Sequence, residues 1–138
     1  MPKAEYEKKK ADLAKEGIEV FAATEGDDLR YMLAIGAEGT YSNGRITHIG
    51  QIPSRGTLEE EIIHMHQSQK YGELGSSDSV ELVAREIAAN RKLLNEKDRI
   101  GLDELDTADV ERNLKIWEKA FADLTGGSYD EKNHRRDV

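Results

Sequence analysis

The most informative stretch of the sequence is residues 57–67, TLEEEIIHMHQ. On a helix, at about 100° per residue, Glu60, His64 and Gln67 share one face. Glu60 and His64, at positions i and i+4, can then point at one metal ion, as paired ligands on a metal-binding helix do. The residues of the opposite face are apolar and would hold the helix against a core; they are Leu58, Ile62 and Met65. We therefore expect a helix with a metal-binding face, which excludes His66 because it lies about 200° around the helix from His64.

The same residues also have an interpretation without a metal. Thr57 and Glu60 have the spacing of a capping box, in which the Glu60 side chain bonds back to the backbone N–H of Thr57. Acidic residues in the first turn of a helix are also favoured by its dipole. A polar face opposite an apolar face is commonly the solvated side of a helix. The spacing by itself leaves both interpretations open.

The composition limits the classes of function. The 138 residues carry a formal net charge of -8, which argues against a groove that binds nucleic acid by neutralising phosphates. The sequence has no cysteine, so disulfides, thiolate metal ligands and a cysteine nucleophile are excluded. No apolar run is long enough to cross a bilayer, and the N-terminus is charged where a signal peptide is apolar. We expect a soluble protein that binds neither nucleic acid nor membrane.

The pattern of apolar, glycine and capping residues predicts an α+β chain. Short strands at residues 18–21 and 45–52, with a hairpin turn at residues 43–44, predict a small sheet in the first half that packs on helices. Helices dominate the second half. The expected helices are residues 2–16, 29–35, 57–70, 80–95 and 107–124, with caps at Thr57, at residues 76–78 and at Thr107. We expect a single domain over residues 1–127 and a mobile tail without a role over residues 128–138.

Glu86 is a third candidate ligand, on the helix predicted for residues 80–95. Apolar residues occur on two sides of that helix, so it is expected to be buried, and Glu86 lies within one of the two apolar sets. A buried carboxylate is costly unless it is paired or binds a metal. The structural alternative is an ion pair with Arg85, Arg91 or Arg112. Since a glutamate from a following helix can also complete a zinc site, the sequence leaves both roles open.

These residues resemble the metallopeptidase toxin 4 group of zincin-like domains. Such domains occur at the C-termini of polymorphic bacterial toxins and in some phage head proteins. The similar segments are residues 17–20, GIEV, residues 36–39, GAEG, residues 53–67, PSRGTLEEEIIHMHQ, residues 85–90, REIAAN, and a closing helix with Trp117. The most specific part is the EExxHxxQ run that begins at Glu60, followed by the Glu-Ile-x-Ala run that begins at Glu86.

The resemblance implies a small zincin-like domain and a metal-dependent peptidase. Glu60, His64 and Glu86 would bind one divalent metal, and Glu61 would be the general base that activates a metal-bound water. Zinc is the first choice of metal. Because two carboxylates place more negative charge on the ion than two histidines do and favour harder ions, manganese and iron are alternatives. The implied partners are a protein or peptide substrate and a cognate immunity or host protein, with the chain cytoplasmic or delivered as part of a toxin or virion protein. The alternative is a catalytically inactive domain of this fold that serves as a binding or structural module.

Three further residues are candidates for supporting roles in the site. Gln67, on the same helix face, would support a ligand or contact substrate. His48, in a predicted strand, could stabilise charge in the site, although a lone strand histidine is commonly a packing residue. Arg55 could bind a substrate carboxylate or an oxyanion, or be a solvated loop residue. Trp117 and Phe121, one turn apart, are expected to be core anchors.

Overall fold

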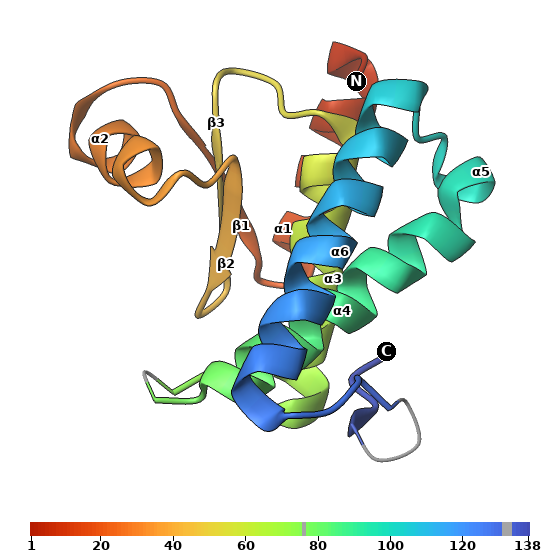
Figure 1. Ribbon diagram of the computed structural model, residues 1–138. Helices are drawn as coiled ribbons and strands as arrows, with labels where there is room; N and C mark the ends of the chain where they lie inside the picture. The colour runs from red at the N-terminus through yellow and green to blue at the C-terminus, as the bar shows by residue number, and fades with distance from the viewer. Residues whose placement is uncertain (76, 131–133) are drawn as a thin grey trace. The chain divides into compact units, whose positions relative to one another are not determined.

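The computed structural model describes residues 1–75, 77–130 and 134–138 (Figure 1). It consists of two compact units, Met1–Met65 and His66–Val138, whose boundary falls within one continuous helix, α3 (Arg55–Tyr71). The predicted α+β class is confirmed, with a small sheet in the first half and a mostly helical second half. In the described part of the chain, no helix is both long and apolar enough to cross a membrane.

The first unit contains a three-stranded sheet in the order β1-β3-β2. Its strands are β1 (Glu19–Ala23), β2 (Gly39–Ser42) and β3 (Arg45–Ile49). β3 pairs in parallel with β1 and antiparallel with β2. The β2–β3 hairpin turns at Asn43 and Gly44, both with positive φ, as a tight Asn-Gly turn requires. β3 ends at Ile49 instead of the predicted residue 52, because Gly50 with φ +74° takes the chain out of the extended conformation.

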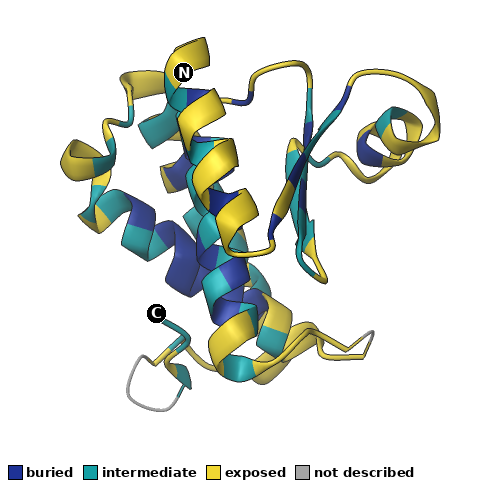
Figure 2. Ribbon diagram, turned by 180° about the vertical axis from the view of Figure 1, so that it is seen from behind, coloured by how far each residue is buried: buried dark blue, intermediate teal, exposed yellow. Residues whose placement is uncertain are grey.

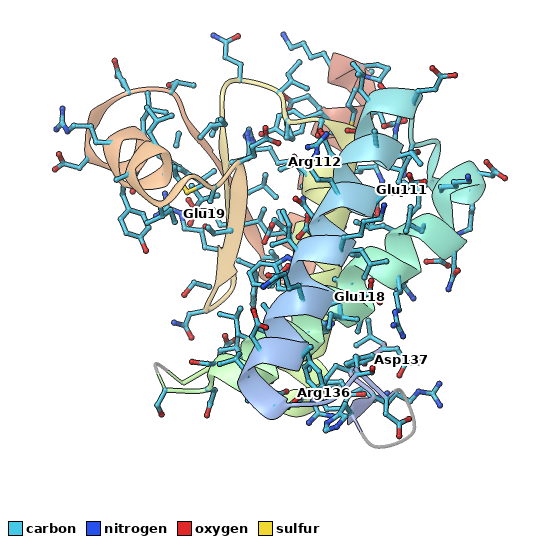
Figure 3. All side chains as sticks on the ribbon, viewed as in Figure 1. Glu19, Glu111, Arg112, Glu118, Arg136 and Asp137 are labelled. Atoms are coloured by element: carbon cyan, nitrogen blue, oxygen red, sulfur yellow. The ribbon has the colours of Figure 1, made fainter. Side chains whose placement is uncertain are left out.

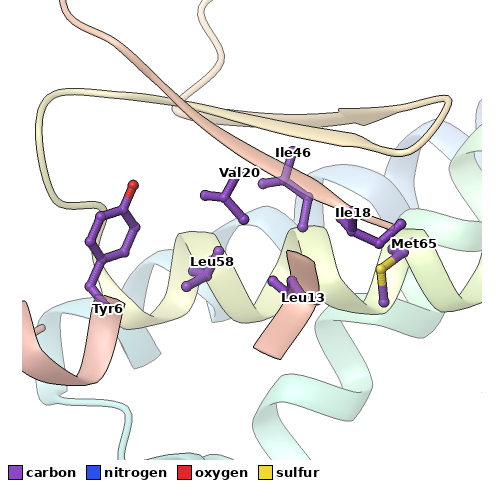
Figure 4. Packing of buried hydrophobic residues seen from close by; sticks show 7 residues of the cluster. All are labelled: Tyr6, Leu13, Ile18, Val20, Ile46, Leu58 and Met65. Atoms are coloured by element: carbon purple, nitrogen blue, oxygen red, sulfur yellow. The ribbon is translucent and has the colours of Figure 1, made fainter. Parts of the chain in front are cut away.

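One face of this sheet packs on α1 (Lys3–Lys15) and α3, and the other on α2 (Gly26–Ile35). The core between the sheet, α1 and α3 is apolar and close-packed (Figure 4); its residues are Tyr6, Leu13, Ile18, Val20, Ile46, Leu58 and Met65. Val20 and Ile46 are paired in register, so they project to the same face. α2 contacts β1 and β3 and is mostly exposed (Figure 2), with Met32 as its buried residue and Thr40 of β2 against its sulfur. The sheet therefore carries the N-terminal half of α3 on one face.

The second unit is helical, and its core lies between α4 (Ser79–Asn95) and α6 (Glu104–Thr125). The buried cluster consists of Val83, Ala84, Ile87 and Phe121, with Leu114, Trp117, Ala120 and Tyr129 packed against it. Phe121 is 1% exposed, which confirms the prediction that Trp117 and Phe121 anchor the core. The predicted helix over residues 80–95 is confirmed almost to the residue.

The loops and helix caps of the second unit agree only in part with the predictions. α6 begins earlier than predicted, because Asp103 is its N-cap and accepts a hydrogen bond from the backbone N–H of Asp106 at 2.7 Å; Thr107 lies inside the helix. A short helix, α5 (Lys97–Ile100), occupies part of the predicted loop. Of the cap predicted at residues 76–78, Ser76 lies outside the described residues, and Asp78 is the N-cap residue of α4.

The described part of the C-terminal segment packs against helices of its own unit, the second. The ring of Tyr129 packs edge-on against Phe121 at 5.6 Å between centroids, and its hydroxyl donates to the carbonyl of His134 at 3.0 Å. Residues 131–133 lie outside the described residues. The mobility predicted for residues 128–138 stays a prediction, as does the single domain predicted for residues 1–127.

Candidate metal centre

The start of α3 separates the two interpretations of Glu60. The helix begins at Arg55, and the hydroxyl of Ser54 accepts a hydrogen bond from the backbone N–H of Thr57 at 3.1 Å. Ser54 therefore makes the capping contact, and the prediction of a cap at Thr57 is wrong. Because the Thr57 N–H is directed to Ser54, the predicted capping box, which needs that N–H for Glu60, is not formed.

The polar face of α3 is not a solvated helix face. The side chains of Glu60 and His64 are 23% and 15% exposed, and Gln67 is fully buried. The Nε2 atom of His64 lies 3.6 Å from Oε1 of Glu60. The opposite face carries Leu58 and Met65 into the core of the first unit, as predicted. One helix thus presents a carboxylate and an imidazole side by side in a sheltered position.

Glu86 on α4 completes a group of three ligands. Glu60, His64 and Glu86 each offer one ligand atom, and these atoms all lie within 4.8 Å of one another. The neighbouring residue, Arg85, accepts a hydrogen bond at its carbonyl from Nε2 of Gln67 at 2.9 Å, which ties α3 to α4 one turn beyond His64. The three residues predicted as ligands thus form a group that could hold a metal ion, and their role as ligands stays a prediction.

The spacing of these atoms suits one metal ion. A tetrahedral ion with bonds of about 2.1 Å places its ligand atoms about 3.4 Å apart. The His64–Glu60 separation of 3.6 Å is close to that value, and the ligand atoms of the whole group lie within 4.8 Å of one another. Two carboxylates and one imidazole also form a donor set that zinc, manganese and iron accept. The residues present therefore fit a divalent cation.

The arginines named as alternative partners of Glu86 each form an ion pair with another carboxylate. Arg85 bonds to Glu81 at 2.9 Å, Arg91 to Glu118 at 3.1 Å, and Arg112 to Asp109 at 2.9 Å. Arg85 is the most buried of the three, with a side chain that is 4% exposed. An ion pair between Glu86 and one of these arginines stays a prediction, as does the role of Glu86 as a metal ligand.

Glu61, the predicted general base, is buried against the edge strand β2. It is 6% exposed, and a Cβ atom added to Gly39 would lie 3.1 Å from its Cγ and 3.3 Å from its Oε2. The same Cβ would lie 2.8 Å from Cγ2 of Thr57, closer than such atoms approach in proteins. Gly39 is thus the residue that lets α3 come this close to β2. A glycine in a strand can mark such a close approach, but the sequence analysis did not predict a strand at Gly39.

His48 and Arg55 form contacts within the first unit. His48 is fully buried, and its Nε2 accepts from the Tyr6 hydroxyl at 2.6 Å while its Nδ1 donates to the Ile49 carbonyl at 3.2 Å. Burial lowers the pKa of His48, and the charge of Lys10 adds to this, so the imidazole is neutral. The guanidinium of Arg55 binds both oxygens of Glu5, at 2.9 and 3.1 Å. Substrate contacts by His48, Arg55 and Gln67 stay predictions.

Comparisons of the chain with protein-family models, with curated proteins and with solved structures found no match. The resemblance to zincin-like toxin domains therefore stays a prediction that rests on the sequence motifs quoted above. The observations that bear on function are the group of Glu60, His64 and Glu86 and the position of Glu61 beside it.

Proposed function

We propose that this protein is a metal-dependent hydrolase that cleaves peptide bonds. The observation that carries the proposal is the sheltered group of Glu60, His64 and Glu86, whose ligand atoms lie within 4.8 Å of one another. A polar cluster of two carboxylates and an imidazole, partly withdrawn from water, is costly unless the charges are neutralised, and a divalent ion does this directly. The zincin-like motif resemblance supports the same assignment.

The residues around the group have complementary tasks. Glu60, His64 and Glu86 would hold the ion, which when bound supplies a Lewis acid that polarises the scissile carbonyl and increases the acidity of water. Glu61 follows Glu60 directly, so its carboxylate can accept the proton of the attacking water and deliver it to the leaving amine. Burial of Glu61 against β2 restricts its rotamers and thereby keeps it oriented.

A peptide is the substrate class that the surroundings favour. β2 is at the edge of the sheet and pairs with β3 on one side. The other side of an edge strand can pair with an extended peptide through main-chain hydrogen bonds. Glu61 lies beside Gly39 of this strand, and this closeness favours an extended peptide at the edge as the substrate.

Metal content is the first test. We expect about one equivalent of zinc, manganese or iron in the wild-type protein purified without chelator, or after titration, and a loss of that metal in His64→Ala. His66→Ala is the matched control, because His66 points away from the group on the same helix, and it should retain the metal. A wild-type protein that neither contains nor takes up metal would overturn the proposal.

Hydrolysis separates the proposed enzyme from an inactive module of the same fold. Glu61→Gln should keep the metal and the circular-dichroism spectrum while kcat on a defined peptide mixture, followed by mass spectrometry, falls by at least about a hundredfold. Equal activity of the wild type and Glu61→Gln would remove Glu61 from the mechanism. A wild type that binds metal but cleaves none of the peptides would favour the binding or structural module.

A further inference from the structure

The described end of the chain lies along α3 and α4 of the second unit and is held there by its backbone. The carbonyl of Arg136 accepts from Nε2 of Gln67 at 3.0 Å. The carbonyl of Asp137 accepts from the hydroxyl of Tyr71 at 2.9 Å and from Nζ of Lys70 at 3.3 Å. Farther along, an oxygen of residue 138 accepts from Nζ of Lys92 at 2.9 Å. Two successive main-chain carbonyls of a non-helical segment, and an oxygen of the residue after them, are thus bound by side chains of two helices.

Figure 3 labels Arg136, the residue of the segment whose side chain binds the same surface. The Nε of Arg136 donates to both carboxylate oxygens of Glu81, at 2.7 and 2.8 Å. Its guanidinium also lies over the ring of Tyr71, 5.4 Å from the centroid. Glu81 in turn accepts from Nε of Arg85, whose side chain is 4% exposed and lies near the hydroxyl of Ser68. The carboxylate that receives Arg136 is therefore oriented by a buried arginine.

The electrostatics of this contact favour a guanidinium. Burial acts to raise the pKa of Glu81, but the hydrogen bonds from Arg136 and Arg85 outweigh it, so the pKa lies below its usual value and the carboxylate is charged. A planar guanidinium can bond the carboxylate and stack on the Tyr71 ring at once, whereas an ammonium makes weaker use of both contacts. The surface thus combines groups that bind any main chain with one position selective for arginine.

We propose that this surface, formed by Gln67, Lys70, Tyr71, Glu81 and Lys92, is a binding site for an extended, arginine-bearing peptide segment of a partner protein. Residues 135–138 occupy the site in cis. The contacts that hold them are hydrogen bonds, an ion pair and a cation–π contact at partly exposed positions, and such contacts are individually weak in water. Tethering keeps the segment bound through its high effective concentration. A partner peptide competes with it by making the same contacts.

The charged residues of the surface are placed to suit an arginine-bearing segment. Glu81 receives the guanidinium, and Lys70 and Lys92 donate to main-chain oxygens. The inference uses none of the three metal ligands, so its test and the test of the proposed function can fail independently.

The test uses the full chain and an acetylated, amidated peptide with the sequence of residues 134–138, HRRDV, labelled for fluorescence anisotropy. Arg136→Ala weakens the cis contact, so this variant should bind the peptide at least about tenfold more tightly than the wild type does. Arg135→Ala is the matched control, because Arg135 pairs with Asp137 inside the segment, and it should bind like the wild type. A peptide with alanine in place of its second arginine should bind the Arg136→Ala variant at least about tenfold more weakly than HRRDV.

Two further measurements guard against a misfolded variant. Adding Glu81→Gln to Arg136→Ala should reduce peptide binding at least about tenfold while the circular-dichroism spectrum is unchanged. Hydrogen exchange at residues 136–138 should be faster in Arg136→Ala than in Arg135→Ala. Equal peptide affinity of wild type, Arg135→Ala and Arg136→Ala, or equal affinity for the two peptides, would overturn the proposal.

Discussion

Gly39→Ala tests the close approach of β2 to α3 at Gly39. The added methyl would lie 2.8 Å from Cγ2 of Thr57, well inside the 3.4 Å at which ordinary van der Waals contact begins. Thr57 cannot rotate away freely, because its χ1 is restricted in a helix and its hydroxyl accepts from Ser54 at 2.9 Å and donates to Glu38 at 3.2 Å. The strand or the helix must therefore shift, or those hydrogen bonds must break.

Overpacking of this kind typically costs about 1–3 kcal/mol, and breaking a hydrogen bond of Thr57 would add about 1 kcal/mol. For a chain of this size we expect a fall in Tm of roughly 4–12 °C, measured by circular dichroism. The second tight contact of the new methyl is with Glu61, so peptide hydrolysis should fall as well if Glu61 is the general base. Stability and activity would then change together in one variant of a residue that is not itself reactive.

A second substitution, at Thr57, tests whether its methyl group is what the new side chain at residue 39 meets. Thr57→Ser removes the clashing methyl but keeps the hydroxyl, so the double variant with Gly39→Ala should recover more than half of the lost stability, as measured in a double-mutant cycle. Gly127→Ala is the matched control, because an added Cβ there meets nothing within 4 Å, and its Tm should be almost unchanged. An unchanged Tm in Gly39→Ala, or an equal loss with and without Thr57→Ser, would show that the two elements do not meet in this way.

Three further predictions concern pH, metal binding and a helix cap. Burial lowers the folded-state pKa of His48 below its unfolded value of about 6.5, so the free energy of unfolding should fall as the pH falls from 7 to 5. In urea titrations, His48→Gln should make this dependence on pH weaker. An unchanged dependence would contradict the buried, neutral imidazole. A divalent metal at a hundred times its Kd should raise the free energy of unfolding of the wild type by about 2.7 kcal/mol, and it should not stabilise His64→Ala. The change in Tm on adding metal measures this. An equal change in both proteins would place the ion at another site. Asp103→Ala should cost about 1 kcal/mol in unfolding free energy, while Thr107→Ala should be almost neutral; the reverse order in chemical denaturation would restore Thr107 as the cap.

The sequence by itself determined most of the local structure. Apolar spacing and glycine positions predicted the helices and the sheet of an α+β chain, because these signals depend on residues only a few positions apart. The same local rule placed Glu60 and His64 on one helix face, since residues i and i+4 are always neighbours there. The ends of elements were predicted less well. Ser54 and Asp103 are the caps where Thr57 and Thr107 were expected, because Ser, Asp and Thr can all cap a helix and the sequence does not rank these positions.

Tertiary structure decided every contact between distant segments. The bond from Tyr6 to His48 joins residues 42 positions apart, and the bond from Arg136 to Glu81 joins residues 55 positions apart. The sequence named Glu86 as a ligand through a motif, but only folding brings it within 4.8 Å of Glu60 and His64. The geometry of helices and turns is set by residues that are neighbours along the chain. Contacts between elements depend instead on how buried surfaces fit one another, and no spacing in the sequence encodes that fit.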